Sequence, residues 1–225
     1  MWKVDLHSHT IHSHDAFAPV DAIIRTCVRR GIDCLAVTDH NRVDGAVRLS
    51  ALAPFQVIIG EEIRTTEGEI IGLFLRERIP PLLSPEETIV EIRRQRGVVY
   101  IPHPFSEGRR ESRFPRRRLE EIVQEVDVVE VLNPRNRDPS LDERARELAR
   151  TAGRLAGAGS DAHTTFELGN AYVEMEPFDD PARFLKSLAN GRIRGRRTPL
   201  WWRAIANHRV RKAARALVPA PRSSS

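Results

Sequence analysis

Two histidines separated by one residue, His7 and His9, lie near the start of the chain, directly after a short apolar run. If residues 4–6 continue a strand, the alternation of side chains places Asp5, His7 and His9 on the same side. Neutral imidazole and carboxylate groups are ligands that suit Zn, Mn or Fe. A single His pair can also be a surface accident, so its meaning depends on the rest of the chain.

Further imidazoles and carboxylates, and one side-chain amide, each follow a short apolar run. They are His40 after residues 35–37, Glu61 and Glu62 after 57–59, His103 after 98–101, Asn133 after 128–131, and Asp161 and His163 after 155–156. In barrels of alternating strands and helices, the chemistry gathers where strands end and loops begin. This regular placement therefore predicts one shared site.

The elements that position these residues alternate along most of the chain. Strands are predicted at residues 3–6, 34–38, 56–60, 70–75, 98–101, 126–132, 155–159 and 171–175, and helices at 20–30, 43–53, 85–96, 115–125, 139–152 and 181–190. Repeated strand-then-helix units favour an α/β fold with a parallel sheet, and about seven repeats are enough to close a barrel. Residues 66–69 interrupt the pattern and predict a hairpin turn. Ser84-Pro85 and Asp180-Pro181 are typical helix starts.

The composition is that of a globular protein of 225 residues with a net charge of +5, in which only three of 36 basic residues are lysine. Arginine binds phosphate through a planar pair of donors, so the bias fits phosphorylated or nucleic-acid ligands; base composition or a warm habitat explains it equally well. No apolar run approaches the roughly 18 residues that span a bilayer, and Met1 leads directly into a strand, so we expect a cytoplasmic protein. Cys27 and Cys34 are expected to be reduced and buried, without a function.

The composition changes after Asn190-Gly191. We expect residues 1–190 to form the main domain and residues 191–225 to form a basic C-terminal extension, helical in part and disordered at its end. The extension holds Trp201-Trp202 and a segment rich in arginine at 203–215. A helix that packs its tryptophans on the barrel is favoured over a nucleic-acid contact, although basic clusters with aromatic residues suit both.

Taken together, the motifs resemble the PHP (polymerase and histidinol phosphatase) family in its small stand-alone form. The motifs are His7-x-His9, Thr38-Asp39-His40, Gly60-Glu61-Glu62-Ile63, His103-Pro104 and Gly159-Ser160-Asp161-Ala162-His163, and the resemblance runs from Met1 to about Met175. It implies a distorted, TIM-like barrel of seven βα units. It also implies two or three divalent ions (Zn, Mn or Fe) at the C-terminal face of the barrel and hydrolysis of phosphate esters.

The resemblance also implies a ligand set. His7 and His9 would hold a first ion with Glu62 and Asp161, and Glu62 would bridge to a second ion held by His103. A third ion would be held by Asp15, His40 and His163, with His14 as the competitor of Asp15. One departure from the family pattern concerns the second ion, because no further His or Cys lies between His103 and His163. Glu130 or water would then complete that site.

Other residues receive roles in catalysis or substrate binding. Asp161 or Asp39 would accept the proton of the nucleophile, and His163 or His40, if unliganded, would protonate the leaving group. Substrate phosphate would be bound by Arg109, Asn133 and Arg135. Asp5 is expected to orient an imidazole by hydrogen bonding, and Glu61 to lie behind the ligands or in solvent.

The first hypothesis for function is a metal-dependent phosphoesterase or phosphatase that acts on a small phosphorylated metabolite or nucleotide. An alternative is a nuclease that trims 3′ or 5′ ends. A third is a non-catalytic module with structural metals whose basic C-terminal segment contacts nucleic acid. The substrate, the native metal, the number of ions and the oligomeric state are left open by the sequence.

Overall fold

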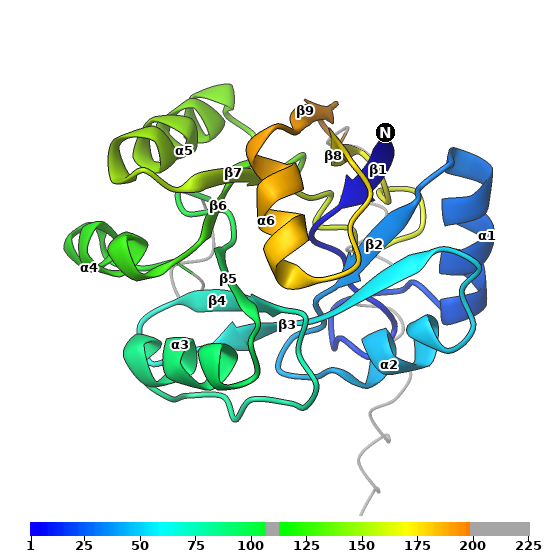
Figure 1. Cartoon of the computed structure of the whole chain (residues 1–225), viewed down its shortest axis with the longest axis horizontal. Helices are drawn as coiled ribbons and strands as arrows, with labels where there is room; N and C mark the ends of the chain where they lie inside the picture. The colour runs from blue at the N-terminus through cyan, green and yellow to red at the C-terminus, as the bar shows by residue number, and fades with distance from the viewer. Residues whose placement is uncertain (107–112, 199–225) are drawn as a thin grey trace, which may run out of the picture.

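The fold is described from a computed structural model, which defines residues 1–106 and 113–198. Its centre is one sheet in the order β7-β6-β5-β4-β3-β2-β1-β8-β9 (Figure 1). The strands are β1 (Trp2–Asp5), β2 (Cys34–Val37), β3 (Gln56–Arg64), β4 (Glu69–Leu73), β5 (Val98–Ile101), β6 (Val128–Leu132), β7 (Leu155–Ala158), β8 (Ala171–Met175) and β9 (Arg192–Gly195). The eight predicted strands are all present, and β9 is an addition.

The sheet is mixed, whereas a parallel sheet was predicted. Strands β1, β2 and β3 pair in parallel, as do β5, β6 and β7, but β4 runs antiparallel to both of its neighbours. The reason is the predicted turn, which is confirmed: Thr65 N donates to Gly68 O at 2.8 Å, so β3 leads into β4 as a hairpin. A hairpin connection fixes an antiparallel pair.

The sheet curves until its end strand β7 meets the chain that follows β1. Leu6 N donates to Ala158 O at 3.3 Å and His9 N donates to Ala162 O at 2.9 Å, and a parallel bridge joins Ser8 to Ala162. These bonds nearly close the sheet, and the predicted α/β barrel is confirmed. The closure brings the first and last of the candidate motifs together.

Helices α1 (Val20–Arg30) and α2 (Asp44–Ser50) cover one side of the barrel. Helices α3 (Pro85–Arg94), α4 (Arg116–Ile122), which continues into a 3₁₀ turn at Val123–Glu125, and α5 (Pro139–Ala152) cover the other (Figure 1). The predicted start of α3 is confirmed, because Ser84 and Glu87 form a reciprocal capping box ahead of Pro85. Asp180 likewise accepts from Arg183 N at the start of α6 (Pro181–Ala189).

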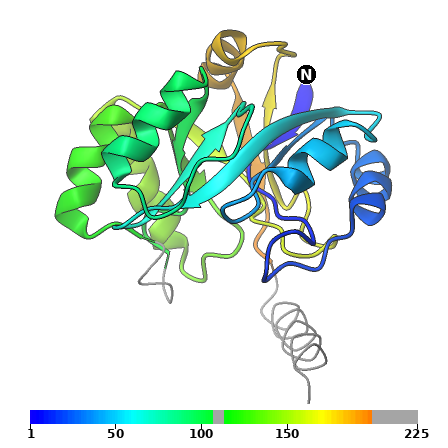
Figure 2. The same cartoon turned by 90° about the horizontal axis from the view of Figure 1, so that it is seen from below.

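The inside of the barrel is filled by alternate side chains of the strands, among them Val4, Ala36 and Val173. Helix α6 adds Phe184 and Leu188 to this core, so it plugs the barrel. In Figure 2, α6 lies at the top, on the side where β1 begins, and the loop after β1 runs at the bottom. The apolar plug therefore leaves the opposite end, where the parallel strands finish, to polar residues.

Strand β9 pairs antiparallel with β8 and lies inside the segment expected to form the C-terminal extension. The extension from residue 199 onward, including Trp201-Trp202 and the basic segment, lies outside the described residues. Where the main domain ends along the chain stays a prediction. Within residues 1–106 and 113–198, the helices are too short or too polar to span a lipid bilayer.

Candidate metal centre

The candidate ligands come from the loops that follow β1, β2, β5 and β7 and from the C-terminal part of β3. Two of them stand on unusual backbone: His103 has φ 26° and Asp161 has φ 48°. Non-glycine residues rarely adopt positive φ, and such strain concentrates at functional sites. Here it turns both side chains, directly after their strands, toward the polar end of the barrel.

Four of the predicted ligands form the centre of the cluster. The Nε2 atoms of His7 and His9 lie 3.2 Å apart. Glu62 Oε2 is 3.5 Å from His7 Nε2 and 3.4 Å from His9 Nε2, and Asp161 Oδ1 is 3.7 and 3.4 Å from the same two nitrogens. All four residues are buried. The structure thus brings together residues that lie more than 150 positions apart in the sequence.

The donor atoms of this central group fit a divalent ion. Glu62 Oε2 and Asp161 Oδ1 are buried but make no hydrogen bond with the described residues. Buried carboxylate oxygens are costly unless they are hydrogen bonded or coordinate a metal. Two imidazoles and two carboxylates within ligand-to-ligand distance are also a donor set that suits Zn, Mn or Fe.

His103 and His40 lie on either side of Glu62. His103 Nε2 is 3.1 Å from Glu62 Oε1, and His40 Nδ1 is 3.1 Å from Glu62 Oε2. His7, Glu62 and His103 each offer a ligand atom within 4.8 Å of the others. The two oxygens of Glu62 therefore face different imidazoles, an arrangement that could bridge two ions; the bridging role stays a prediction.

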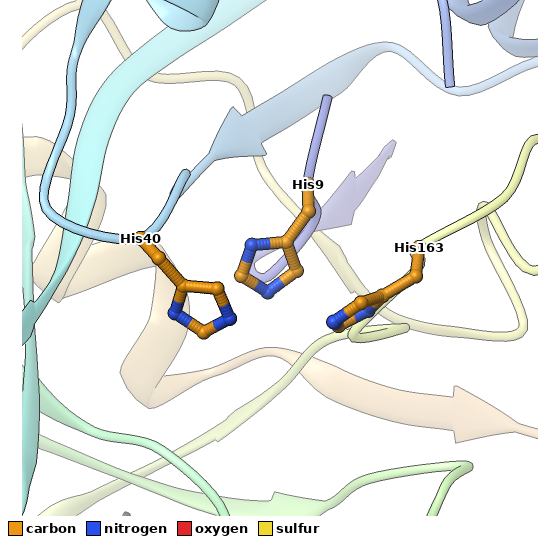
Figure 3. Close-up of side chains that lie close together, drawn as sticks. All are labelled: His9, His40 and His163. Carbon is orange, nitrogen blue, oxygen red and sulfur yellow. The ribbon is translucent and has the colours of Figure 1, made fainter. Parts of the chain in front are cut away.

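A third group consists of His9, His40 and His163, whose rings come from three separate segments and point toward one another (Figure 3). The ring centroid of His9 lies 4.6 Å from that of His40 and 4.4 Å from that of His163. Asp15 joins them, with Oδ2 3.1 Å from His163 Nε2 and Oδ1 3.5 Å from His40 Nε2. His14, the competitor of Asp15, is exposed, with its ring centroid 5.4 Å from that of His40.

Glu130 does not complete a metal site in this arrangement. Its Oε1 lies 3.1 Å from His7 Nδ1 and accepts a hydrogen bond from Tyr100 Oη at 3.1 Å. Its Oε2 accepts from His103 N at 2.9 Å and from Asn133 Nδ2 at 2.8 Å. Both oxygens are occupied, and Glu130 orients the His7 ring so that Nε2 faces the cluster.

Asp5 does not orient an imidazole, so that prediction is wrong. Strand β1 ends at Asp5, whose Oδ1 accepts from His7 N at 3.4 Å in a local turn, and the turn breaks the alternation that was expected to continue to His9. The carboxylate accepts instead from Ser160 N, Ser160 Oγ and Gly169 N at 2.8, 2.6 and 2.8 Å. It therefore ties the loop after β7 to β1 and acts on the cluster only through the backbone.

Asp39, a candidate proton acceptor, is not brought into the cluster. Its carboxylate accepts from Thr10 N, Thr10 Oγ1 and Ser13 Oγ at 2.7, 2.7 and 2.9 Å. Ser13 Oγ in turn lies 3.3 Å from His9 Nδ1. A carboxylate whose oxygens are held in this way positions the loop that carries His9 and has no free face toward a substrate.

The candidate phosphate-binding residues are only partly assembled. Asn133 is buried, and its Nδ2 donates to Glu130 and, at 3.3 Å, to Asp161 Oδ2, so it holds carboxylates. Arg135 is half-buried, with Nε 3.7 Å from Asp161 Oδ2 and Nη1 3.6 Å from Glu167 Oε1, and it lies at the edge of the cluster. Arg109 lies outside the described residues.

The close packing of imidazoles and carboxylates shifts their pKa values. Burial lowers the pKa of His7, but the carboxylates of Glu130, Glu62 and Asp161 outweigh it and hold the pKa well above its usual value. Burial, together with His163 and His40, holds the pKa of His9 well below its usual value.

The bridging group and its neighbour respond to the same charges. Burial raises the pKa of Glu62, but His7 and His40 outweigh it and hold the pKa well below its usual value. Burial lowers the pKa of His40, but Glu62 and Asp15 outweigh it and raise the pKa to about 9. Without an ion, the cluster therefore holds protons where ligands must be deprotonated.

Three residues near the cluster were missed by the sequence reasoning. Tyr100 donates to Glu130, Glu167 accepts from His163 N at 3.1 Å, and Glu69 offers a ligand atom within 4.8 Å of His40 and Glu62. Glu69 and Glu167 could have been noticed in the sequence, because each is a charged residue inside or beside an apolar segment. For Tyr100, in the run Val98-Val99-Tyr100-Ile101, the sequence carries no signal beyond burial.

The fold is an α/β barrel whose polar end carries clusters of side chains that could hold metal ions. Comparisons with known proteins place the chain in a family. The family model described as PHP domain matches residues 5–153, and the model described as PHP-associated matches residues 140–193. The chain belongs to the PHP family.

Relatives and solved structures agree with this assignment. The chain is 38% identical over 195 residues to an uncharacterized protein of Methanocaldococcus jannaschii, which covers 83% of this chain and 78% of that protein. A second uncharacterized protein of that organism is 44% identical over 117 residues, which are 46% of this chain and 68% of that protein.

Two solved structures share the fold at low identity. PsfC from Pseudomonas syringae is 17% identical with a TM-score of 0.69, covering 94% of this chain and 98% of that one. The second is a two-domain protein from Bacteroides vulgatus, described as containing a predicted PHP-like metal-dependent phosphoesterase. It is 16% identical with a TM-score of 0.69, and the match covers 87% of this chain and 65% of that one. These two comparisons show that the fold of this chain is shared with both proteins.

Proposed function

We propose that this protein is a metal-dependent hydrolase of phosphate monoesters, with a small phosphorylated metabolite or nucleotide as substrate. The observation that carries the proposal is a pair of buried carboxylate oxygens, Glu62 Oε2 and Asp161 Oδ1. They face His7 and His9 and make no hydrogen bond within residues 1–106 and 113–198. Burying a carboxylate oxygen without a hydrogen bond is costly, and a bound cation would offset that cost. Membership of the PHP family supports the same reaction class.

The ligand assignment follows the three groups of side chains. His7, His9, Glu62 and Asp161 would hold one ion, and His103 with Glu62 would hold a second. His40, His163 and Asp15 would hold a third. The second ion has the thinnest protein ligand set, since Glu130 is engaged elsewhere. Divalent ions bound here would lower the pKa of a bound water and neutralise phosphate oxygens, which are the two difficulties of ester hydrolysis.

The residues of this chain would hold the substrate and move its protons. Arg135 is placed to donate to a phosphate oxygen from the rim, and Asn133 keeps Asp161 in position through Nδ2. Asp161 is the proton acceptor that lies inside the cluster, and it takes the role for which Asp39 was the other candidate. If it holds no third ion, His163, which lies beside Asp15, is the proposed proton donor to the leaving oxygen.

The acid role of His163 has its own signature. His163→Asn should slow the hydrolysis of alkyl phosphates far more than that of p-nitrophenyl phosphate, whose leaving oxygen needs no proton. Equal losses with both substrates, together with loss of bound metal, would make His163 a ligand only.

The proposal is tested with protein loaded with Mn or Zn, assayed on p-nitrophenyl phosphate, nucleoside 3′,5′-bisphosphates and short end-labelled RNA. A chelator should abolish turnover. Glu62→Gln should remove both turnover and bound metal, because it exchanges the bridging carboxylate for an amide. Glu61→Gln is the matched control, because Glu61 is the buried neighbour that accepts from Ile79 N at 2.8 Å, away from the cluster.

The same assay separates the other functions. Stepwise shortening of the RNA without release of phosphate from the small esters would make the protein an end-trimming nuclease. Binding of RNA with a steep salt dependence, and no turnover of any substrate, would mean a nucleic-acid-binding module with structural metals. Either outcome would replace the proposed phosphatase.

A further inference from the structure

A basic pocket lies outside the barrel wall, where β1, β8 and β9 run side by side. We call it the β8–β9 pocket. Its volume is about 450 Å³. Its functional groups come from Lys3, Arg30, Asn170, Tyr172, Arg194 and Arg196. The volume falls in the range of about 300 to 1,000 Å³ that is typical of small-molecule sites.

The pairing of the strands explains why these side chains meet. Val4 of β1 and Val173 of β8 are neighbours that point into the barrel core, so the next residues along each strand, Lys3 and Tyr172, point outward. Tyr172 lies directly opposite Arg194 of β9. The unpredicted strand β9 thus adds an arginine to a face that already holds a lysine and an aromatic ring.

Two of the cations are held by backbone and aromatic groups. Lys3 Nζ donates to Arg30 O at 2.9 Å and lies 4.8 Å from the centroid of the Tyr172 ring. The Arg30 guanidinium donates to the carbonyls of Phe166 and Leu168. These contacts fix the two side chains but leave their positive charges in place.

The balance of charge in the pocket is strongly positive. Arg194 Nε pairs with Glu174 Oε2 at 3.0 Å, while Arg196 Nε donates to the neutral Asn170 Oδ1 at 3.2 Å. Within the described part of the chain, no carboxylate lies within ion-pair distance of Lys3 Nζ, Arg30 or Arg196. Burial, followed by the charges of Arg196 and Arg29, lowers the pKa of Arg30, as expected when neighbouring cations repel one another.

The pocket is separate from the metal cluster. Gly169, which lines the pocket, donates its N–H to Asp5 Oδ2, and Asp5 Oδ1 accepts from Ser160 N on the cluster side. Asp5 therefore stands between them. A ligand in the pocket would be held outside the barrel wall, away from His7 and His9.

We propose that the β8–β9 pocket is a second anion site, which binds the phosphate group of a phosphorylated ligand. Arginine forks and a lysine ammonium are the donors that recognise phosphate, and four of these cations face one carboxylate here. The phosphate belongs either to a free nucleotide or to the backbone of a single-stranded oligonucleotide. The proposal does not depend on hydrolysis at the metal cluster.

The test is calorimetric titration of the full chain with inorganic phosphate, AMP and a ten-nucleotide single strand. Glu62→Gln protein is used as the background, because this substitution is expected to remove metal-dependent phosphate binding at the cluster. The variant Arg194→Gln/Arg196→Gln should weaken phosphate binding at least about tenfold. The matched control, Arg146→Gln/Arg150→Gln on α5, removes the same charge from an exposed surface and should bind as the background does.

The two ligand sources give different patterns in the same variants. A parallel loss of AMP and oligonucleotide binding would assign the site to a nucleic-acid backbone, whereas a loss confined to phosphate and AMP would assign it to a nucleotide. Equal binding by the pocket variant and the α5 control would overturn the proposal.

A second measurement needs no substitution. The chain has three lysines, Lys3, Lys186 and Lys212, so acetylation of each can be followed by mass spectrometry. Phosphate should protect Lys3 and leave Lys186, exposed on α6, unprotected. Equal protection of both lysines would also overturn the proposal.

Discussion

Replacing Glu130 by glutamine perturbs the metal cluster from behind without touching a proposed ligand. The wild-type carboxylate contacts His7 Nδ1 and Tyr100 Oη through Oε1, and His103 N and Asn133 Nδ2 through Oε2. A glutamine of the same shape retains one accepting oxygen and places an NH₂ group against the other pair of donors. Two buried hydrogen bonds are then lost, and the His7 ring loses a carboxylate partner or the His103 backbone loses its anchor.

The expected cost follows from these contacts. Each buried donor left without an acceptor costs about 1 to 3 kcal/mol, so the variant should lose about 2 to 6 kcal/mol of unfolding free energy. Removing the partner of a metal-ligating imidazole typically lowers metal affinity by about 10- to 100-fold. Both losses should appear together, because the same carboxylate holds the rings and the strands.

The assay pairs urea unfolding of the metal-free protein with a competition titration against a fluorescent zinc chelator. Glu61→Gln serves as the control, since this buried carboxylate accepts from one backbone N–H on the other side of β3. Glu130→Gln with wild-type metal affinity and wild-type stability would refute the reasoning that this residue orients His7.

Other predictions concern protons, substrate and packing. Although burial opposes it, neighbouring carboxylates raise the pKa of His40 to about 9. Metal binding should therefore release protons, and the apparent affinity for metal should fall as the pH drops below about 9. Calorimetry in buffers of different ionisation enthalpy measures this proton release, and its absence would contradict the prediction. Arg135→Gln should raise KM about 10- to 100-fold with little change in kcat, while the exposed Arg137→Gln should change neither; an unchanged KM for Arg135→Gln would remove Arg135 from the substrate site. Gly159→Ala should disrupt the centre, because a Cβ there would lie 2.3 Å from His7 Cβ; thermal melting and metal content equal to wild type would contradict this.

The sequence predicted most of the barrel because its strands are short apolar runs and its helices carry strong start signals. The hairpin between β3 and β4 was predicted from Thr66-Glu67-Gly68-Glu69. The prediction of a parallel sheet did not take into account that this hairpin makes β4 antiparallel to β3. Strand β9 was missed because Arg192-Ile193-Arg194-Gly195 is an edge strand with mostly exposed residues, which leaves little apolar alternation to detect. Polar edge strands are defined by their neighbour and not by their own composition.

The candidate site shows a similar division. Residue types at strand ends were enough to predict which side chains gather, since parallel strands deliver their ends to one face. The directions of Asp5 and Asp39 could not be predicted, because each is set by hydrogen bonds to a loop, from Ser160 and Gly169 in one case and from Thr10 and Ser13 in the other. The roles of Glu130 and Tyr100 could not be predicted either, because they depend on a contact between β5 and β6.

The central claim is that imidazoles and carboxylates from distant segments form one site for divalent ions. Elemental analysis of purified protein after extensive dialysis tests it most directly. The account predicts at least one tightly bound Zn, Mn or Fe ion per chain in the wild type, and loss of that ion in Asp161→Asn. Wild-type protein without stoichiometric metal, or Asp161→Asn protein with the same metal content as wild type, would contradict it.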